Sequence, residues 1–440
     1  MKIYIETLGC PKNTVDSENM AALLEGNGHQ IIVNPEEADM VIVNTCGFIN
    51  DAKVESIDTV FEMAQLKEDN PDMILAMSGC LSQRYADSLF DEMPEVDVFL
   101  GVNDYDKINE IVDEIAVNER LKKVSDAPAS YCEIPERKTD EGAFTAYLRI
   151  SEGCDNVCSY CVIPSIRGGF RSRKKEDILA EAQMLADRGV KELVIIAQDV
   201  TAYGKDIYRG YVLHELLTEL CRIDGIHWIR LLYCYEDSIT DELIQVIKNE
   251  DKICKYLDIP LQHINDEILS AMNRHSTTES IKSTIERLRR EIPDVHIRTT
   301  FIVGFPGERQ AHFDELEEFV AETGFDRMGV FAYSKEENTV AAEMKGQVRE
   351  STKERRQDIL MQLQREISLA KNEEKIGMTL EVLVDEKCDD GTYMGRTQYD
   401  APDIDNGVIF TSDRDLEPGQ FVNVTVIDAF DYDLTGKESL

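Results

Sequence analysis

The sequence predicts an α/β protein in three parts: a doubly wound parallel-sheet domain, an open six-stranded (β/α) barrel and a small all-β domain. Three observations lead to this prediction. Short β-branched or apolar runs alternate with polar helical stretches over residues 1–120, and the same alternation resumes near residue 146. A long charged helix then leads to a final segment that has only strand patterning.

The first domain, residues 1–120, has predicted strands at 2–8, 39–44, 73–78 and 96–101. Because helical stretches separate these strands, the strands are expected to run parallel in one doubly wound sheet. Residues 121–142 are charged and irregular and are interpreted as a linker.

The second domain, residues 143–372, has predicted strands at 147–150, 193–197, 228–233, 256–260, 296–303 and 327–331. Six strands with intervening helices predict an open, partial barrel of the TIM type. A helix at about 351–375 ends this domain, and the all-β domain covers residues 373–440.

Composition limits the partners and the compartment. The chain has 47 basic and 86 acidic residues, a net charge of −39, which repels phosphate backbones unless a basic patch is present. The one candidate patch is the run 167–175; elsewhere the acidity favours a cationic partner, although surplus carboxylates also keep a protein soluble. Eleven cysteines, with no export signal and no membrane-spanning apolar run, predict a cytoplasmic protein with reduced thiols or metal ligands.

The spacing CxxxCxxC at Cys154, Cys158 and Cys161 is the strongest local motif. Three thiolates on a cluster of four irons leave one iron open, where a small molecule can chelate. The alternatives are a zinc knuckle, which usually needs a fourth ligand that is missing nearby, or a disulfide pair. The spacing, with Tyr160 before the last cysteine, resembles the signature of radical S-adenosylmethionine (SAM) enzymes, in which the open iron holds SAM.

Three further cysteines form no local spacing motif, but each has the same position relative to a predicted strand. Cys10, Cys46 and Cys80 each follow a predicted strand of the first domain. Because the carboxyl ends of parallel strands meet at one sheet edge, these thiols are expected to converge on a second three-thiolate cluster. The neighbouring glycines, Gly9, Gly47 and Gly79, would let the backbone approach a bulky ligand. The alternative is three unrelated buried cysteines.

The run TLGCPKNTVDSE at residues 7–18 resembles the opening motif of the methylthiotransferases, and with both cysteine triads the resemblance covers essentially the whole chain. It implies a methylthiotransferase N-terminal domain, a radical SAM domain and a C-terminal, OB-like TRAM barrel. It also implies that Cys10, Cys46 and Cys80 hold an auxiliary 4Fe–4S cluster whose open iron carries sulfur for insertion. The cofactors implied are therefore two 4Fe–4S clusters and SAM, supplied with electrons by a donor such as flavodoxin or ferredoxin.

Two branches of this family differ in substrate. One modifies adenosine in transfer RNA, and the other modifies the β-carbon of an aspartate on ribosomal protein S-twelve. The stretches 151–173, 259–264 and 395–405 resemble the second branch. Residues 376–440 carry fifteen acidic and four basic side chains, a net charge of −11, which would repel RNA and attract a basic ribosomal protein. The transfer-RNA enzyme and a non-catalytic iron–sulfur carrier remain the alternatives, and nothing in the sequence demands an oligomer or a membrane.

Secondary site residues are predicted at strand ends and in the basic run. For each residue, the alternative to a contact with SAM or substrate is an ordinary buried hydrogen bond or a solvated position in a loop. The predicted SAM contacts are Tyr160, Gln198, Asp199, Arg298, Gly304 and Glu308, and the predicted substrate contacts are Arg167, Arg171, Gln262 and His263. Ordinary reduced cysteines are expected at Cys132, Cys221, Cys234, Cys254 and Cys388, and Trp228 is expected in the core.

Overall fold

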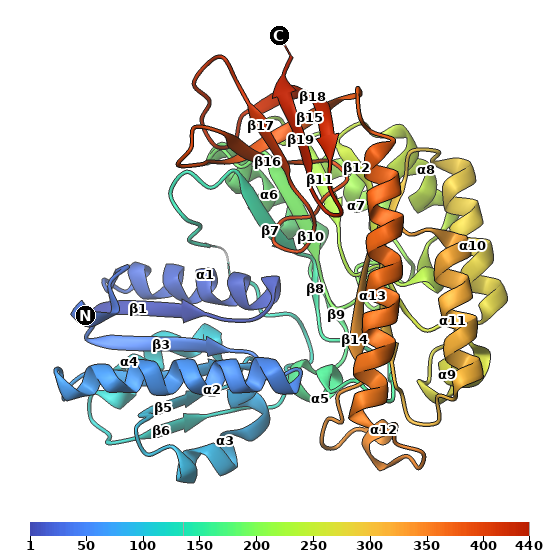
Figure 1. Ribbon diagram of the computed structural model, residues 1–440. Helices are drawn as coiled ribbons and strands as arrows, with labels where there is room; N and C mark the ends of the chain where they lie inside the picture. The colour runs from blue at the N-terminus through green and yellow to red at the C-terminus, as the bar shows by residue number, and fades with distance from the viewer. Residues whose placement is uncertain (135, 440) are drawn as a thin grey trace.

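The computed structural model describes residues 1–134 and 136–439, which form three units (Figure 1). The N-terminal domain lies to one side of a central domain, and a small C-terminal barrel lies over one end of the central domain. The predicted fold class is confirmed in all three parts. No helix within the described residues is long and apolar enough to cross a membrane.

The N-terminal domain is a six-stranded parallel sheet in the order β2-β1-β3-β4-β5-β6. Its strands are β1 (Lys2–Thr7), β2 (Gln30–Ile31), β3 (Met40–Thr45), β4 (Ile74–Gly79), β5 (Val98–Leu100) and β6 (Leu121–Lys123). Its α-helices are α1 (Pro11–Gly26), α2 (Asn50–Gln65), α3 (Cys80–Glu92) and α4 (Ile108–Ile115).

The central strand β3 explains why this sheet is covered on both faces. All six of its residues are buried, and the first four alternate between two apolar clusters. Met40 and Ile42 pack with helices α1 and α4, whereas Val41 and Val43 pack with α2 and α3. A strand buried on both sides needs helices on both faces, which is the doubly wound arrangement.

The stretch predicted as a linker, 121–142, contains a short strand and an interdomain ion pair. Its first residues form β6, which pairs with β5 at the sheet edge. Farther along, the buried Arg137 donates to Glu18 of the N-terminal domain and to Glu181 of the central domain. Arg137 therefore ties the two domains together.

The central domain is an open parallel sheet in the order β14-β13-β12-β11-β10-β7. The sheet strands are β7 (Thr145–Arg149), β10 (Glu192–Ile196), β11 (Trp228–Leu231), β12 (Ile253–Gln262), β13 (His296–Val303) and β14 (Arg327–Ala332). A small hairpin pairs β8 (Ser151–Glu152) with β9 (Arg171–Ser172). The helices are α5 (Ile163–Arg167), α6 (Lys175–Asp187), α7 (Leu213–Leu220), α8 (Asp241–Asn249), α9 (Asp266–Ala271), α10 (Thr278–Glu291), α11 (Gln310–Thr323), α12 (Val340–Glu343) and α13 (Glu350–Glu373).

The C-terminal strands close into a barrel in the order β15-β16-β17-β19-β18. They are β15 (Thr379–Lys387), β16 (Tyr393–Thr397), β17 (Val408–Thr411), β18 (Phe421–Ala429) and β19 (Leu434–Glu438). The barrel is attached at the start of the central strands. There the buried Trp228 packs edge-on against Phe421 at 4.8 Å between ring centroids, which confirms Trp228 as a core residue.

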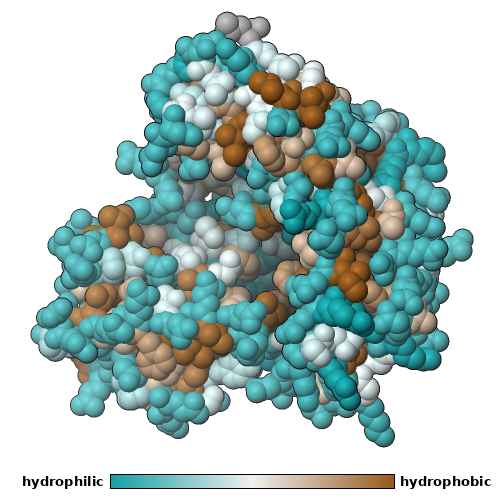
Figure 2. Space-filling view, in the orientation of Figure 1, coloured by the Kyte–Doolittle hydropathy of each residue, from teal (hydrophilic) through white to brown (hydrophobic). Residues whose placement is uncertain are grey.

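The domains enclose a hollow. Strands β1 and β3 point from the outer edge of the N-terminal domain toward the central domain (Figure 1). Figure 2 shows the surface hollowed between the N-terminal domain at lower left and the C-terminal barrel above it. The carboxyl ends of the N-terminal strands therefore face the place where ligands bind in open α/β folds.

Candidate active site

Cys10, Cys46 and Cys80 follow β1, β3 and β4, which are adjacent strands of one parallel sheet. The shared register brings the three cysteines to one edge, where Cys10 and Cys80 lie close enough to act on the charge of the Cys46 thiol. Burial raises the pKa of Cys46 to about 12 and also raises the pKa of Cys80. Such thiols stay protonated until a metal replaces the proton.

The glycines beside these cysteines stand where a side chain would clash with the chain itself. Gly9 has a φ of +91°, and a side-chain carbon there would lie 2.7 Å from Cβ of Cys46. Gly79 has a φ of +95°, and the same carbon would lie 2.3 Å from the carbonyl oxygen of Thr45. At Gly47 it would lie 2.8 Å from the backbone of Leu81. The glycines therefore let the three cysteine loops pack closely on one another, and their approach to a bulky ligand stays a prediction.

Cys154, Cys158 and Cys161 lie in the loop between β8 and α5. Cys154 and Cys158 act on the charge of the Cys161 thiol, so the three are close together. Burial raises the pKa of Cys154 to about 11 and that of Cys161 to about 12. Within the described residues, no three His, Cys, Asp or Glu side chains are grouped as a site for a single metal ion. The assignment of both triads to iron–sulfur clusters therefore stays a prediction.

Two tyrosines flank the second triad. The hydroxyl of Tyr235 lies 3.1 Å from Sγ of Cys158 and accepts a hydrogen bond from Nη1 of Arg274 at 3.0 Å. Arg274 is in turn held by both carboxylate oxygens of the buried Glu236. Tyr160 packs among apolar side chains that include Met272 and Phe305. A contact between Tyr160 and SAM stays a prediction.

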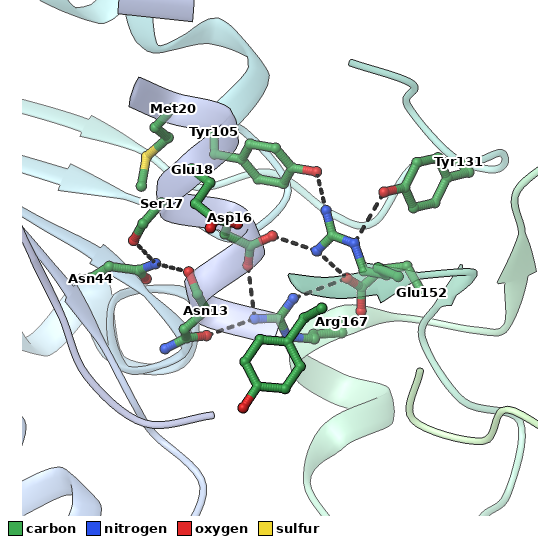
Figure 3. A network of polar contacts seen from close by, with 12 residues as sticks. Asn13, Asp16, Ser17, Glu18, Met20, Asn44, Tyr105, Tyr131, Glu152 and Arg167 are labelled. Carbon is green, nitrogen blue, oxygen red and sulfur yellow. Dashed lines mark hydrogen bonds and ion pairs between the residues drawn. The ribbon is translucent and has the colours of Figure 1, made fainter. Parts of the chain in front are cut away.

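A buried ionic network joins the two domains beside the first triad (Figure 3). Arg167 of α5 pairs with Asp16 of α1 at 3.0 Å and with Glu152 of β8 at 3.0 Å. Its Nη2 also lies 3.6 Å from Sγ of Cys80. Arg149 pairs with the same two carboxylates. Its side chain is fully buried and has no contact with solvent. The hydroxyls of Tyr105 and Tyr131 accept hydrogen bonds from Arg149.

The basic run 167–175 is therefore not a surface patch, which corrects the prediction. Arg167, Arg171 and Arg173 are all at least nine-tenths buried. Arg171 donates to the carbonyl oxygens of Gly169 and Arg167, which holds the loop after α5 and leaves the guanidinium turned inward. Carboxylates of the chain already hold Arg167, and carbonyl oxygens hold Arg171, whose Nε has no hydrogen-bond partner within the described residues. The substrate contacts of both residues stay predictions.

Gln198 and Asp199 follow β10, as predicted. Gln198 donates to Glu152 at 2.6 Å, which links it to the ionic network. Asp199 accepts from the side chains of Thr201 and Asn156 and from the backbone of Ala202. Burial nevertheless raises the pKa of Asp199. Asn156 belongs to the cysteine loop, so Asp199 holds that loop in place; its contact with SAM stays a prediction.

Gln262 and His263 end β12 in different settings. Gln262 is half-buried and has a φ of +71°, which is uncommon for a residue other than glycine and costs local strain. His263 is fully buried, and burial lowers its pKa to about 3. The position of His263 does not support the predicted substrate contact. The contact of Gln262 stays a prediction.

Gly304 and Glu308 form a closed loop against α13. The backbone N–H of Gly304 donates to Glu308 at 2.8 Å, and Arg356 of α13 donates to the same carboxylate at 2.7 Å. A side-chain carbon on Gly304 would lie 2.3 Å from Lys353, so the space beside this glycine is filled by α13. The structure thus gives both residues a role in the loop, and their contacts with SAM stay predictions.

Arg298 was expected at the carboxyl end of a strand, and the structure corrects this. It is the third residue of β13, near the amino end, where it pairs with Asp258 at 2.9 Å and with Asp405 of the C-terminal barrel at 3.3 Å. Its position in the strand turns it toward the attached barrel. Arg298 therefore links two domains rather than reaching the mouth of the central sheet.

Five cysteines lie outside the two triads. Cys221, Cys234 and Cys254 are buried, Cys132 is exposed and Cys388 is intermediate, and all are free thiols.

Sequence reasoning missed Asp16, Glu152, Tyr235 and Lys12. Three of these flank the cysteine motifs within a few residues, which was the available signal; Tyr235 follows a predicted strand end and had no other signal.

Comparisons with known proteins fit this arrangement. Residues 2–101 match the uncharacterized protein family UPF0004, 148–320 match the radical SAM superfamily and 376–438 match the TRAM domain. Among solved structures, the radical SAM methyltransferase TsrM from Kitasatospora setae is similar, with a TM-score of 0.55 at 15% identity over 75% of this chain and 72% of TsrM. The cobalamin-dependent enzyme OxsB also has a TM-score of 0.55, at 12% identity over 82% of this chain and 56% of its own.

Curated relatives are far more similar in sequence. The ribosomal protein uS12 methylthiotransferase RimO of Thermoanaerobacter sp. (strain X514) is 49% identical over 435 residues, 99% of each chain. RimO of Acetivibrio thermocellus is 50% identical over 444 residues, 99% of this chain and 98% of the relative.

The open parallel barrel with its CxxxCxxC loop defines a radical SAM enzyme, a class that uses a 4Fe–4S cluster and SAM. Within that class, the chain belongs to the RimO family of methylthiotransferases.

Proposed function

We propose that this enzyme inserts a methylthio group at the β-carbon of an aspartate of ribosomal protein uS12. The observation that carries the proposal is the near-full-length similarity to RimO proteins, together with two cysteine triads on facing domains. A β-carbon C–H bond has no acidic proton for an ordinary base, so a polar mechanism offers little and the cofactors must carry the difficult step.

The residues present fit two clusters. Each triad supplies three free thiols, which would leave one iron of a 4Fe–4S cluster without a protein ligand. In this proposal Cys154, Cys158 and Cys161 hold the cluster that chelates SAM, and Cys10, Cys46 and Cys80 hold a second cluster. When bound, these groups would supply the organic radical and the sulfur that the reaction needs, and a second molecule of SAM would supply the methyl carbon.

The chain's own side chains position the two triads. Arg167 and Arg149 pair with carboxylates from both domains, which fixes the first triad relative to the central barrel. Tyr235 and Asp199 hold the second triad's loop through Cys158 and Asn156. The contacts of Arg167 and Arg149 with Asp16 and Glu152 are buried, so they hold this arrangement away from solvent.

The C-terminal barrel supports a basic protein as substrate. Nine of its acidic residues are exposed, and six of these have no ion pair within the described part of the chain: Glu386, Asp389, Asp390, Asp403, Glu417 and Asp428. Ribosomal proteins are basic, so this surface would attract one. The burial of Arg167, Arg171 and Arg173 removes the one predicted basic patch that would have favoured transfer RNA.

An anaerobic assay tests the proposal. The reconstituted protein is incubated with SAM, a reductant such as flavodoxin or ferredoxin with its reductase, and either uS12 or transfer RNA. Mass spectrometry is expected to show a methylthio group gained by uS12 alone. Modified transfer RNA would contradict the substrate assignment, and absence of 5′-deoxyadenosine would favour the non-catalytic carrier. The enzyme is proposed to act in the cytoplasm, as a monomer.

A further inference from the structure

Lys12 is a buried cation in the first turn of α1, two residues after Cys10. The residue is 7% exposed, and Nζ lies 3.4 Å from the ring centroid of Tyr233. No hydrogen bond or ion pair to Nζ is found within the described residues. An ammonium group taken out of water without an anionic partner is costly, so its position calls for a ligand.

The neighbouring cations differ from Lys12 in this respect. Arg167 and Arg149 share Asp16 and Glu152, and Arg298 pairs with Asp258 and Asp405. Cys10, Glu152 and Asp258 are close enough to act on the charge of Lys12. Guanidinium groups already hold the two carboxylates by hydrogen bonds, and the thiol of Cys10 is a cluster ligand in the proposed function. Within the described residues, Lys12 is thus a cation at this junction whose ammonium makes no hydrogen bond or ion pair, which leaves its donors for a molecule from outside.

The surroundings of Lys12 place it between the two triads. Lys12 belongs to the N-terminal domain next to Cys10, whereas Tyr233 follows β11 at the carboxyl end of a central strand. Helix α1 is 16 residues long and begins at Pro11, so the positive end of its dipole lies beside the same ammonium. Both features favour an anion at this position. A carboxylate is an anion that one ammonium group and the amino end of a helix can bind together.

We propose that Lys12 and the first turn of α1 form a carboxylate-binding subsite for the side chain of the acidic substrate residue. This inference rests on the proposed function. The carbon to be modified in aspartate is bonded directly to its carboxylate carbon. A carboxylate held by Lys12 therefore places that β-carbon beside Cys10, where the second cluster would be bound. Lys12 acts as a substrate-binding residue in this arrangement.

The test compares two basic uS12 peptides that differ only by Asp or Asn at the target position. Equilibrium binding to the reconstituted enzyme is measured anaerobically by fluorescence anisotropy. The wild type is expected to bind the Asp peptide about 10- to 100-fold more tightly than the Asn peptide, as for a charge-assisted hydrogen bond. Lys12→Met is expected to bring this ratio close to one, and Lys12→Arg, which keeps the charge, to restore part of it.

Matched measurements separate the possible outcomes. Lys2→Gln removes an exposed ammonium of the same domain and is expected to leave the ratio unchanged. Iron content and SAM affinity of Lys12→Met are expected to equal those of the wild type. Loss of SAM affinity with an unchanged Asp/Asn ratio would assign the subsite to SAM's carboxylate and overturn the inference. If Lys12→Met loses iron, Lys12→Gln provides the same comparison.

Failure of the inference is distinct from failure of the proposed function. A wild type that modifies the Asp peptide, with variants that keep the full Asp/Asn ratio, overturns only the role of Lys12. A wild type that modifies neither the peptide nor intact uS12 overturns the proposed function and this subsite with it.

Discussion

Nη2 of Arg167 lies 3.6 Å from Sγ of Cys80, while the same guanidinium pairs with Asp16 and Glu152 at 3.0 Å. One buried cation of the central domain thus contacts a thiol and a carboxylate of the N-terminal domain. Because the group is buried, its charge is little screened by solvent, and the two domains depend on it for their relative position.

Arg167→Met is expected to destabilise the protein by about 3–5 kcal/mol. The substitution would leave the two buried carboxylates of Asp16 and Glu152 with Arg149 as their one remaining arginine partner among the described residues. Urea unfolding of the metal-free protein measures this change. Arg309→Met, which removes an exposed arginine paired with Glu267, is the control and is expected to cost under about 1 kcal/mol. Equal effects of the two substitutions would show that the network contributes no special stability.

Iron content is expected to separate the triads from the other cysteines. The reconstituted wild type should hold about eight irons per chain, and a Cys46→Ala or Cys158→Ala variant about four. Cys132→Ser, at an exposed cysteine outside both triads, should retain about eight. Iron and acid-labile sulfide assays check this, and a Cys46→Ala variant with full iron content would remove the second cluster from the proposal.

Tyr235→Phe is expected to make the reduction potential of the SAM-chelating cluster more negative. The hydroxyl lies 3.1 Å from Sγ of Cys158, and hydrogen bonds to cluster sulfurs stabilise the reduced, more negative state. A potentiometric titration followed by electron paramagnetic resonance measures the shift. Tyr211→Phe, at an exposed tyrosine, serves as the control, and an unchanged potential in Tyr235→Phe would exclude the hydrogen bond.

Glu192→Gln is expected to loosen the C-terminal barrel. Glu192 is fully buried between Arg230 and Arg396, with both contacts at 2.8 Å. The variant leaves two buried guanidinium groups with less negative charge, at a cost of about 3 kcal/mol at pH 7. Thermal unfolding and limited proteolysis at the junction with the barrel measure this cost.

The same substitution carries a pH dependence. Burial acts to raise the pKa of Glu192, but Arg396 and Arg230 outweigh it and hold the pKa below its ordinary value of 4.5. The folded protein therefore binds fewer protons than the unfolded chain near and below pH 4.5, and the stabilisation present above that pH is lost on acidification. The difference between wild type and Glu192→Gln is expected to shrink as pH falls; a constant difference would contradict the ion pairs.

Binding of uS12 is expected to weaken as salt is added, because exposed carboxylates of the barrel supply the attraction. A double Asp389→Lys, Asp390→Lys variant should slow association several-fold, measured by surface plasmon resonance. The double variant Glu68→Lys, Asp69→Lys, at exposed positions of the N-terminal domain, is the comparison with the same change of charge. Salt-independent binding would remove the acidic surface from substrate recognition.

Much of the fold was predictable because strand and helix patterns repeat within about ten residues. The alternation of β3, α2 and β4 and the placement of Cys46 and Cys80 at strand ends depend only on such local patterns. Parallel order then follows, because helices separate the strands. Strands β2 and β6 were missed, since two or three residues at a sheet edge carry too little pattern to be distinguished from a loop.

The roles of charged residues were decided by the tertiary structure alone. A run of arginines resembles a surface patch in sequence, yet Arg167 is buried because Asp16, 151 residues away, is brought to it by the docking of two domains. Arg298 pairs with Asp405 for the same reason, and Lys12 is left without an anion by the same packing. The sequence by itself determined which chemical groups are available; which of them neutralise one another, and which remain for a ligand, depends on contacts between distant segments that no local pattern encodes.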